Sequence, residues 1–282
     1  MAGGAGYLAE VAETDATGVV AEIYADIKSV MGVPVVNLVY RYLAVRPNVL
    51  EAVWGGVRPH FRDPPTVTRI GRAVRVRSFG LQPWGEHTEA LLGVDREWEN
   101  ALADTLALYN YANTLNLTMV EWALGPTPGA VEICRNSGES APSSVVNPRS
   151  LLPLPMARLA DLDPEVLGLL NEIARSLGPE GEFLVVPSLF RHFTERPAFL
   201  AAIWAVLAVL IRAEGFAAEC LRLRRAAWSV VADVDPLRLG PLDREFLGEI
   251  AGFRELIPRM LFVGGALGEM CGLPGESSSG RA

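Results

Sequence analysis

Apolar residues recur at helical spacing along most of the chain. Between Thr17 and Gly32, apolar side chains recur every three or four residues, with Thr17 a typical N-cap and Gly32 a typical stop signal. The same spacing predicts helices over residues 48–54, 86–98, 101–122, 164–177, 197–211, 217–231 and 243–272. Two short alternating segments, 33–39 and 183–189, are candidate strands, although a proline in each disfavours a strand interior. The pattern predicts an all-α fold.

Residues 125–164 interrupt this pattern. They contain seven prolines together with Gly, Ser and Asn, and show little periodicity, which is the composition of a linker. We therefore expect a first helical repeat over 1–124, a Pro/Gly/Ser-rich linker over 125–163, a second helical repeat over 164–272 and a disordered tail over 273–282.

The two flanking regions contain an internal repeat at an offset of 150 residues. Residues 38–54 and 188–204 share six of 17 positions: Arg41/Arg191, Arg46/Arg196, Pro47/Pro197, Leu50/Leu200, Ala52/Ala202 and Trp54/Trp204. The preceding segments also match, with 27–32 resembling 173–178. A duplicated helical unit predicts a tandem repeat folded as a pseudo-two-fold pseudo-dimer, with a ligand site at the seam between the halves.

Composition narrows the functional classes. The 282 residues carry 25 Lys+Arg against 33 Asp+Glu, a net charge of −8, which argues against nucleic acid as a partner. The longest uncharged apolar run, 197–211, is shorter than the ~20 residues that span a bilayer, so we expect no membrane association. Three scattered cysteines form no metal-binding pattern. We expect a cytoplasmic protein without metal or cofactor.

Several short motifs resemble the group I 2-haloacid dehalogenases, the DehI-type family. They occur in order across nearly the whole chain: Tyr24-Ala-Asp-Ile-Lys28, Val33-Pro34, Arg41, Leu43-Ala44, Tyr109-Asn-Tyr-Ala-Asn113, Leu151-Leu-Pro-Leu154 and Ser188-Leu-Phe190. The resemblance implies an all-α pseudo-dimer with its active site between the halves. It also implies hydrolysis of the carbon–halogen bond of a 2-haloacid, in which a water activated by an aspartate and positioned by an asparagine attacks the α-carbon.

Carried over by position, the resemblance assigns roles to five residues. The water-positioning asparagine corresponds to Asn113 and a pocket serine corresponds to Ser188. Two aromatic pocket walls correspond to Val35 and Leu38, which are aliphatic here. The general-base aspartate corresponds to Leu189, which cannot accept a proton.

The missing aspartate leaves three alternatives: another group acts as the base, the substrate brings its own nucleophile, or catalysis has been lost. His192 follows Ser188 by four residues and is a candidate base; the alternative is a histidine packed beside the seam. Glu180 and Glu182 are candidate surrogate carboxylates, or belong to a solvated loop.

Further polar residues are candidates for binding substrate. Arg41 and Arg191 occupy equivalent repeat positions and could clamp a carboxylate or sulfate, or form structural ion pairs. Asn37 precedes the pocket position and could line the site. Asn113 shares a helical face with Asn110 and Asn116, either as a polar strip at the seam or in hydrogen bonds between helices.

These features predict an enzyme that displaces a halide or similar leaving group from a saturated carbon of a small anionic substrate by an SN2 reaction. One alternative is intramolecular ring closure with loss of halide or sulfate, such as aziridine formation, in specialised metabolism. Another is a non-catalytic relative, or one subunit of a hetero-oligomer. We expect a homodimer, with a hetero-oligomer containing a related subunit as the alternative.

Overall fold

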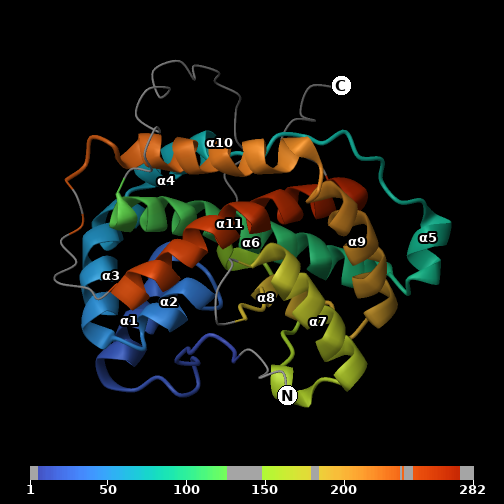
Figure 1. The fold of residues 1–282 in the computed structure, drawn as a ribbon, viewed down its shortest axis with the longest axis horizontal. Coiled ribbons are helices and arrows are strands. Elements are labelled where there is room, and N and C mark those ends of the chain that lie inside the picture. The colour runs from blue at the N-terminus through green and yellow to red at the C-terminus, as the bar shows by residue number, and fades with distance from the viewer. Residues whose placement is uncertain (1–5, 126–147, 179–183, 236, 238–243, 274–282) are drawn as a thin grey trace.

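The computed structural model describes residues 6–125, 148–178, 184–235, 237 and 244–273. Within them lie eleven α-helices, two short 3-10 turns and one isolated β-bridge between Tyr7 and Leu184 (Figure 1). The helices are α1 (Gly18–Met31), α2 (Leu38–Leu43), α3 (Pro47–Phe61), α4 (Pro64–Ala73), α5 (Glu86–Leu91), α6 (Arg96–Leu124), α7 (Pro164–Leu177), α8 (Ser188–Arg191), α9 (Pro197–Leu210), α10 (Glu214–Val231) and α11 (Arg244–Met270). The all-α class predicted from the sequence is confirmed.

Local sequence signals explain where the helices begin and end. Helix α1 starts after Thr17 and stops at Gly32, whose φ of 71° is the left-handed conformation that glycine adopts without strain. Helices α3 and α9 each start on a proline, which fits the first helical position because no N–H is needed there. The residues before these two prolines, Arg46 and Arg196, have almost the same backbone angles.

Two long helices, α6 and α11, lie side by side through the middle of the molecule (Figure 1). The described residues form two hydrophobic cores, and each core includes part of both helices. The first core joins α1–α4 to residues 108–122 of α6, part of α10 and the first half of α11. The second joins α7–α9 to residues 98–109 of α6 and the second half of α11. The long helices therefore run in opposite directions, and each core contains residues from both halves of the sequence.

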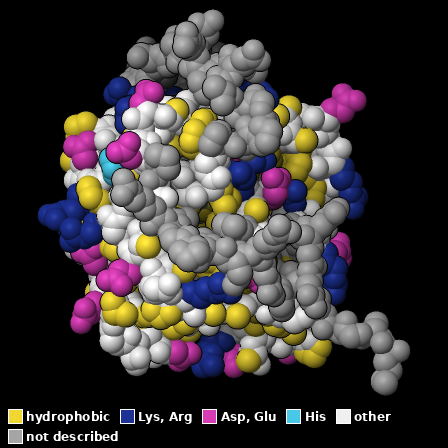
Figure 2. Space-filling model, turned by 60° about the vertical axis from the view of Figure 1, so that its left-hand side comes forward, with side chains coloured by type: hydrophobic (Ala, Val, Ile, Leu, Met, Phe, Trp, Pro, Cys, Tyr) yellow, Lys and Arg dark blue, Asp and Glu magenta, His cyan; other side chains and the backbone are white. Residues whose placement is uncertain are grey.

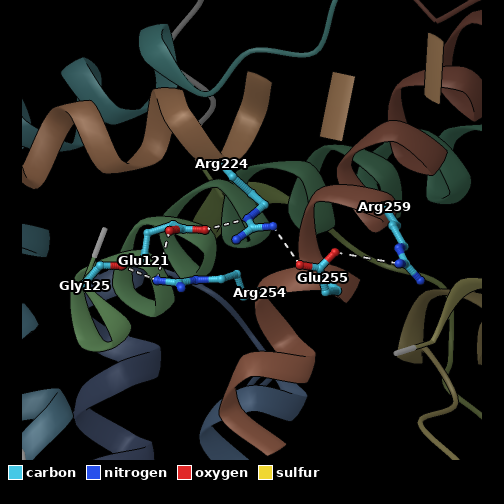
Figure 3. Close-up of polar contacts among 6 residues, drawn as sticks. All are labelled: Glu121, Gly125, Arg224, Arg254, Glu255 and Arg259. Atoms are coloured by element: carbon cyan, nitrogen blue, oxygen red, sulfur yellow. Dashed lines mark hydrogen bonds and ion pairs between the residues drawn. The ribbon is translucent and has the colours of Figure 1, made fainter. Parts of the chain in front are cut away.

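A buried network of charges holds α6, α10 and α11 together (Figure 3). The Glu121 carboxylate, only 1% exposed, accepts from Arg224 Nε at 3.0 Å and lies 3.2 Å from Arg254 Nη2. Arg224 also contacts Glu255 at 2.7 Å, and Arg259 extends the network at 3.8 Å. Burial raises the pKa of Glu121, although both neighbouring guanidinium groups oppose this effect. Each of the two carboxylates lies between two guanidinium groups, so every charge of the network has an opposite charge beside it.

The two candidate strands are wrong as far as the structure describes them. Residues 33–37 form a loop and α2 begins at Leu38; after the isolated bridge at Leu184, the second segment leads into α8. Phe183 lies outside the described residues. The buried positions of the first segment explain the error: Val33, Val36 and Val39 are three residues apart, which fits a turn entering a helix and not a period of two.

Other helices differ from the prediction as well. The helix expected over 48–54 continues to Phe61 as α3. The helix expected over 86–98 is interrupted after α5, because Gly93 adopts a φ of 71° and Asp95 caps α6 by accepting from the Trp98 amide. Helix α4 was not predicted, since it has few apolar positions and buries only Ile70. It starts at an Asp63 cap and two prolines.

The first half of the sequence contains α1–α6 and the second half contains α7–α11. The pseudo-two-fold relation and the domain boundaries stay predictions. Residues 126–147 of the expected linker and 274–282 of the expected tail lie outside the described residues. The described end of the linker packs against the fold: the Leu154 amide donates to Thr105 Oγ1, and the Ala157 amide donates to the Arg191 carbonyl.

Candidate functional site

The N-terminal segment and α2 hold Arg41 between the two cores. Its Nε donates to Glu10 Oε2 at 3.0 Å and its Nη1 donates to the Val36 carbonyl at 3.1 Å. The third nitrogen, Nη2, is buried and has no hydrogen-bond partner. A buried guanidinium N–H without an acceptor is unfavourable, by roughly 1–3 kcal/mol or more for a charged group. Arg41 Nη2 is therefore a buried donor that the described residues leave without an acceptor.

Arg191 on α8 lies close to Arg41. Its Nε donates to the Ala157 carbonyl at 2.9 Å, the one hydrogen bond that this guanidinium group makes with the described residues. Burial lowers the pKa of Arg191 and the positive charge of Arg41 lowers it further, whereas Glu10 and Tyr109 act in the opposite direction. The structure thus brings together the two arginines that the repeat placed at equivalent positions.

His192 is buried beside these arginines. Its Nδ1 lies 2.5 Å from the Leu154 carbonyl and 3.1 Å from the Pro155 carbonyl, and its Nε2 lies 2.9 Å from the Tyr109 hydroxyl. Burial lowers the pKa of His192; the hydrogen bonds to the Leu154 and Pro155 carbonyls oppose this effect, and the charge of Arg191 adds to it. The imidazole is therefore held neutral near pH 7, and its orientation is fixed at both nitrogens.

Tyr109 connects these groups. Burial raises its pKa, opposed by the charges of Arg41 and Arg191 and by the neighbouring Ser188 hydroxyl. Ser188 Oγ is buried and lies near the Tyr109 hydroxyl, but no hydrogen bond of ordinary geometry joins it to another described residue. We call Arg41, Tyr109, Ser188, Arg191 and His192 the seam cluster. It combines two cations, three polar side chains and at least two unpaired polar atoms in a largely buried setting.

The remaining pocket candidates differ in burial. Leu38 is partly buried and packs against both cores. Leu189 is 1% exposed and belongs to the second core, so its position is filled by packing. Val35 is half-buried. Asn37, the first residue before α2, keeps a buried Oδ1 that has no hydrogen-bond partner.

Three asparagines near the middle of α6, Asn110, Asn113 and Asn116, are also buried or partly buried. Asn113 is 8% exposed and lies one helical turn after Tyr109, on the same face. Asn110 Oδ1 packs against Gly264 of α11, where a Cβ atom would overlap it. The amide oxygens of Asn110 and Asn116 have no hydrogen-bond partner, so the interpretation as bonds between helices does not account for them.

Sequence reasoning missed three parts of this arrangement. Tyr109 was visible as the first residue of the motif ending at Asn113, four residues earlier on the same face. Glu10 had no signal, because it comes from a segment without periodicity. The carbonyl groups of Leu154 and Pro155 belong to the expected linker, where a backbone contact leaves no trace in the sequence. The candidate carboxylates Glu180 and Glu182 lie outside the described residues.

A separate groove of about 410 Å³ lies between α1, α3 and α4. Asp26 and Arg58 line it, together with Arg62, Tyr111 and Arg149. Asp26 accepts from Trp54 Nε1 at 2.7 Å and pairs with Arg58 through both oxygens, so its charge is already balanced. The side of the molecule that carries α1 and α3 shows basic and acidic side chains interspersed, without a single-sign field (Figure 2).

Other classes of site have little support in the described part of the chain. It contains no group of three or more His, Cys, Asp or Glu side chains that could hold a metal ion. No single helix there is long and apolar enough to cross a membrane; α9 and α10 reach that length and apolarity only as a pair bent by 89°.

Comparison with known proteins gives the fold. No family model matches the chain, and no curated protein matches its sequence. A solved D-2-haloacid dehalogenase mutant in complex with D-2-CPA matches with a TM-score of 0.69 and 16% identity, over 95% of this chain and 96% of that one. A D-2-haloacid dehalogenase in complex with L-LA matches with a TM-score of 0.61 and 17% identity, over 94% and 92%. The chain therefore has the fold of the D-2-haloacid dehalogenases, as the sequence motifs predicted.

Proposed function

We propose that the chain is an enzyme that displaces a leaving group from a saturated carbon of a small anionic substrate held at the seam cluster. The observation that carries the proposal is the unpaired, buried Nη2 of Arg41 beside Arg191. A substrate carboxylate or sulfate accepts from both guanidinium groups and removes the unfavourable burial of that donor. The D-2-haloacid dehalogenases that share the fold support the reaction class.

The remaining residues fit displacement at carbon. Ser188 Oγ and Asn37 Oδ1 are free to orient the bound anion or the nucleophile. Asn113 lies on the same face of α6 as Tyr109, whose hydroxyl contacts His192 at the end of α8. With the anion fixed, attack opposite the leaving group becomes an effectively intramolecular step, for which effective molarities reach ~10⁵–10⁸ M.

Ring closure within the substrate is a second candidate, favoured by the packing of Leu189. That side chain is fully part of the second core, so no carboxylate stands at the position where the resemblance places the base. A substrate with its own amine or hydroxyl nucleophile depends on alignment more than on activation of a water. Loss of halide or sulfate from the neighbouring carbon then closes the ring.

Release of anions by the purified chain tests both candidates. D- and L-2-chloropropionate report hydrolysis, and a 2-aminoalkyl sulfate or chloride reports ring closure, with the freed halide or sulfate quantified by ion chromatography. Release from the chloropropionates supports hydrolysis; release only from the amino substrates supports ring closure.

A variant and a binding measurement separate the remaining outcomes. If the wild-type chain releases nothing and Leu189→Asp gains halide release, hydrolysis is excluded for the natural protein. Binding of 2-chloropropionate without any release, together with a second protein in native mass spectra of the complex, indicates a subunit whose partner supplies the chemistry.

A further inference from the structure

The Tyr109–His192 hydrogen bond is the one buried pair of proton-transferring groups in the seam cluster. Tyr109 Oη and His192 Nε2 are 2.9 Å apart, and the rings meet edge-on with centroids 5.4 Å apart. Tyr109 is 7% exposed and His192 is 3% exposed. Neither residue is needed to bind the substrate anion in the proposed function.

The surroundings of His192 define which nitrogen carries the proton. Carbonyl oxygens only accept hydrogen bonds, so Nδ1 must donate to the carbonyls of Leu154 and Pro155. The neutral ring then has its lone pair on Nε2, which accepts from the Tyr109 hydroxyl. The imidazole is therefore a base whose free lone pair points at one phenol.

We propose that Tyr109 and His192 form a two-step proton relay that takes the place of the carboxylate missing at Leu189. Tyr109 is the catalytic residue, because its oxygen meets the attacking nucleophile. His192 is a positioning residue that accepts the tyrosine proton. The inference rests on the proposed function for the identity of the reaction.

Atoms and charges balance in the relay, whether the nucleophile is a water or a substrate amine. As a water or substrate amine attacks the carbon, the carbon–leaving-group bond breaks and its electron pair departs with the halide or sulfate. The proton of the nucleophile passes to Tyr109 Oη, and the Tyr109 proton passes to His192 Nε2. His192 leaves the step as an imidazolium and returns its proton to solvent after product release. Asn113, one turn further along α6, lies where an amide could orient the nucleophile.

The charges around the pair couple this relay to substrate binding. The charges of Arg41 of α2 and Arg191 of α8 lower the pKa of Tyr109. The charge of Arg191 also lowers the pKa of His192, and the charge of Glu10 in the N-terminal segment raises the pKa of Arg191. The positive charge of Arg191 opposes formation of an imidazolium. A bound anion neutralises that charge, so the same anion that fills the site makes His192 a stronger base.

Nuclear magnetic resonance tests the relay without turnover. The chain has three histidines, so the His192 signals are assigned by comparison with His192→Gln. Long-range ¹H–¹⁵N correlation spectra should show a neutral Nδ1–H ring at pH 7. Its pKa should rise when sulfate or 2-chloropropionate is added, and Tyr109→Phe should shift the Nε2 resonance. An Nε2–H ring, or a His192 pKa that no saturating anion moves, would overturn the relay.

Kinetics test it on whichever substrate the chain turns over. Tyr109→Phe should lower kcat by about 10²–10⁴-fold with little change in KM, the range for one positioned acid–base group. Tyr111→Phe makes the same change on α6 at a residue that lines the separate groove, and should keep wild-type kcat. His192→Gln should lower kcat and abolish the acid limb of the kcat–pH profile. An unchanged acid limb, or full activity of Tyr109→Phe, would refute the relay.

The NMR and kinetic experiments together distinguish failure of the relay from failure of the proposed function. If no substrate is turned over, the proposed function fails, and the tautomer and the anion-linked pKa of His192 still decide whether the relay geometry exists. If the chain turns over substrate and Tyr109→Phe retains its rate, the function stands and the relay is wrong.

Discussion

Burial and the positive charge of Arg41 together lower the pKa of Arg191, although the two residues are 150 positions apart in the sequence. Two guanidinium groups in a partly buried site repel each other, and only Glu10 among the contacts of Arg41 offsets that repulsion with a full negative charge. Such a pair is stabilised when an anion binds between its members.

The first prediction concerns this anion site. Arg41→Gln should weaken binding of 2-chloropropionate about ten- to a hundredfold, because one charge-assisted hydrogen bond contributes roughly 1.5–3 kcal/mol. Isothermal titration calorimetry measures the affinity. Arg69→Gln removes an exposed arginine of α4 and serves as the matched control. Equal affinity of Arg41→Gln and wild type would mean that the anion binds elsewhere.

The second prediction concerns Glu10, whose carboxylate occupies one side of Arg41. Glu10→Gln keeps an acceptor for Arg41 Nε but removes a negative charge near the two arginines. Binding of 2-chloropropionate should therefore tighten several-fold, and the gain should shrink as the salt concentration rises. Weaker binding of this variant would show that Glu10 orients the guanidinium group and does not compete with the ligand.

Two similar hydrogen bonds occur at positions that the sequence repeat relates, and they could have been predicted from it. Trp54 Nε1 donates to Asp26 at 2.7 Å, and Trp204 Nε1 donates to Glu172 at 2.9 Å. The tryptophans match at the offset of 150, and the carboxylates match at the offset of 146 that relates the preceding segments. The caps of α1 and the all-α class followed from local signals, whereas the short helices α2, α4 and α8 did not.

The arrangement of the cores and half of the site could not be predicted in this way. A repeat does not reveal which core each half of α6 and α11 enters, because both ends of each helix are apolar. Glu10, Leu154 and Pro155 reach the seam cluster from segments with no periodic pattern, and two of them act through backbone carbonyls that any residue supplies.

The third prediction is a pH dependence of stability. The folded-state pKa of His192 lies below its ordinary value of 6.5, so the unfolded chain binds this proton more readily. The stability that the neutral ring contributes is complete above pH 6.5 and is lost as the pH falls toward the lowered pKa, with a slope of at most about 1.4 kcal/mol per pH unit. Urea unfolding between pH 8 and 5 measures it. His192→Gln should remove this part of the slope, whereas His87→Gln, an exposed histidine of α5, should retain it.

The fourth prediction concerns the charge network between the long helices (Figure 3). Glu121→Gln leaves Arg254 and Arg224 buried without their shared counter-ion and should lower the free energy of unfolding by about 3–5 kcal/mol. Glu255→Gln makes the same change at a side chain that is 45% exposed, where water compensates, and should cost about 1 kcal/mol or less. Similar losses for the two variants in urea unfolding would show that burial of Glu121 does not set its importance.

The last prediction concerns the close approach of α6 and α11. A Cβ atom at Gly264 would overlap Asn110 Oδ1, so Gly264→Ala should displace the Asn110 side chain and lower the free energy of unfolding by about 1–3 kcal/mol. Gly268 lies one turn later on α11 with open space around it, and Gly268→Ala should instead stabilise the helix by roughly 0.5–1 kcal/mol.

A double variant identifies the cause of the Gly264 effect. Adding Asn110→Ala to Gly264→Ala removes the overlapping atoms, so the double variant should recover most of the loss relative to Asn110→Ala alone. Full additivity of the two changes in urea unfolding would contradict the contact. Recovery would show that Gly264 is required by the Asn110 amide, one turn from Asn113, and so that the close approach of the long helices positions the asparagine face of the site.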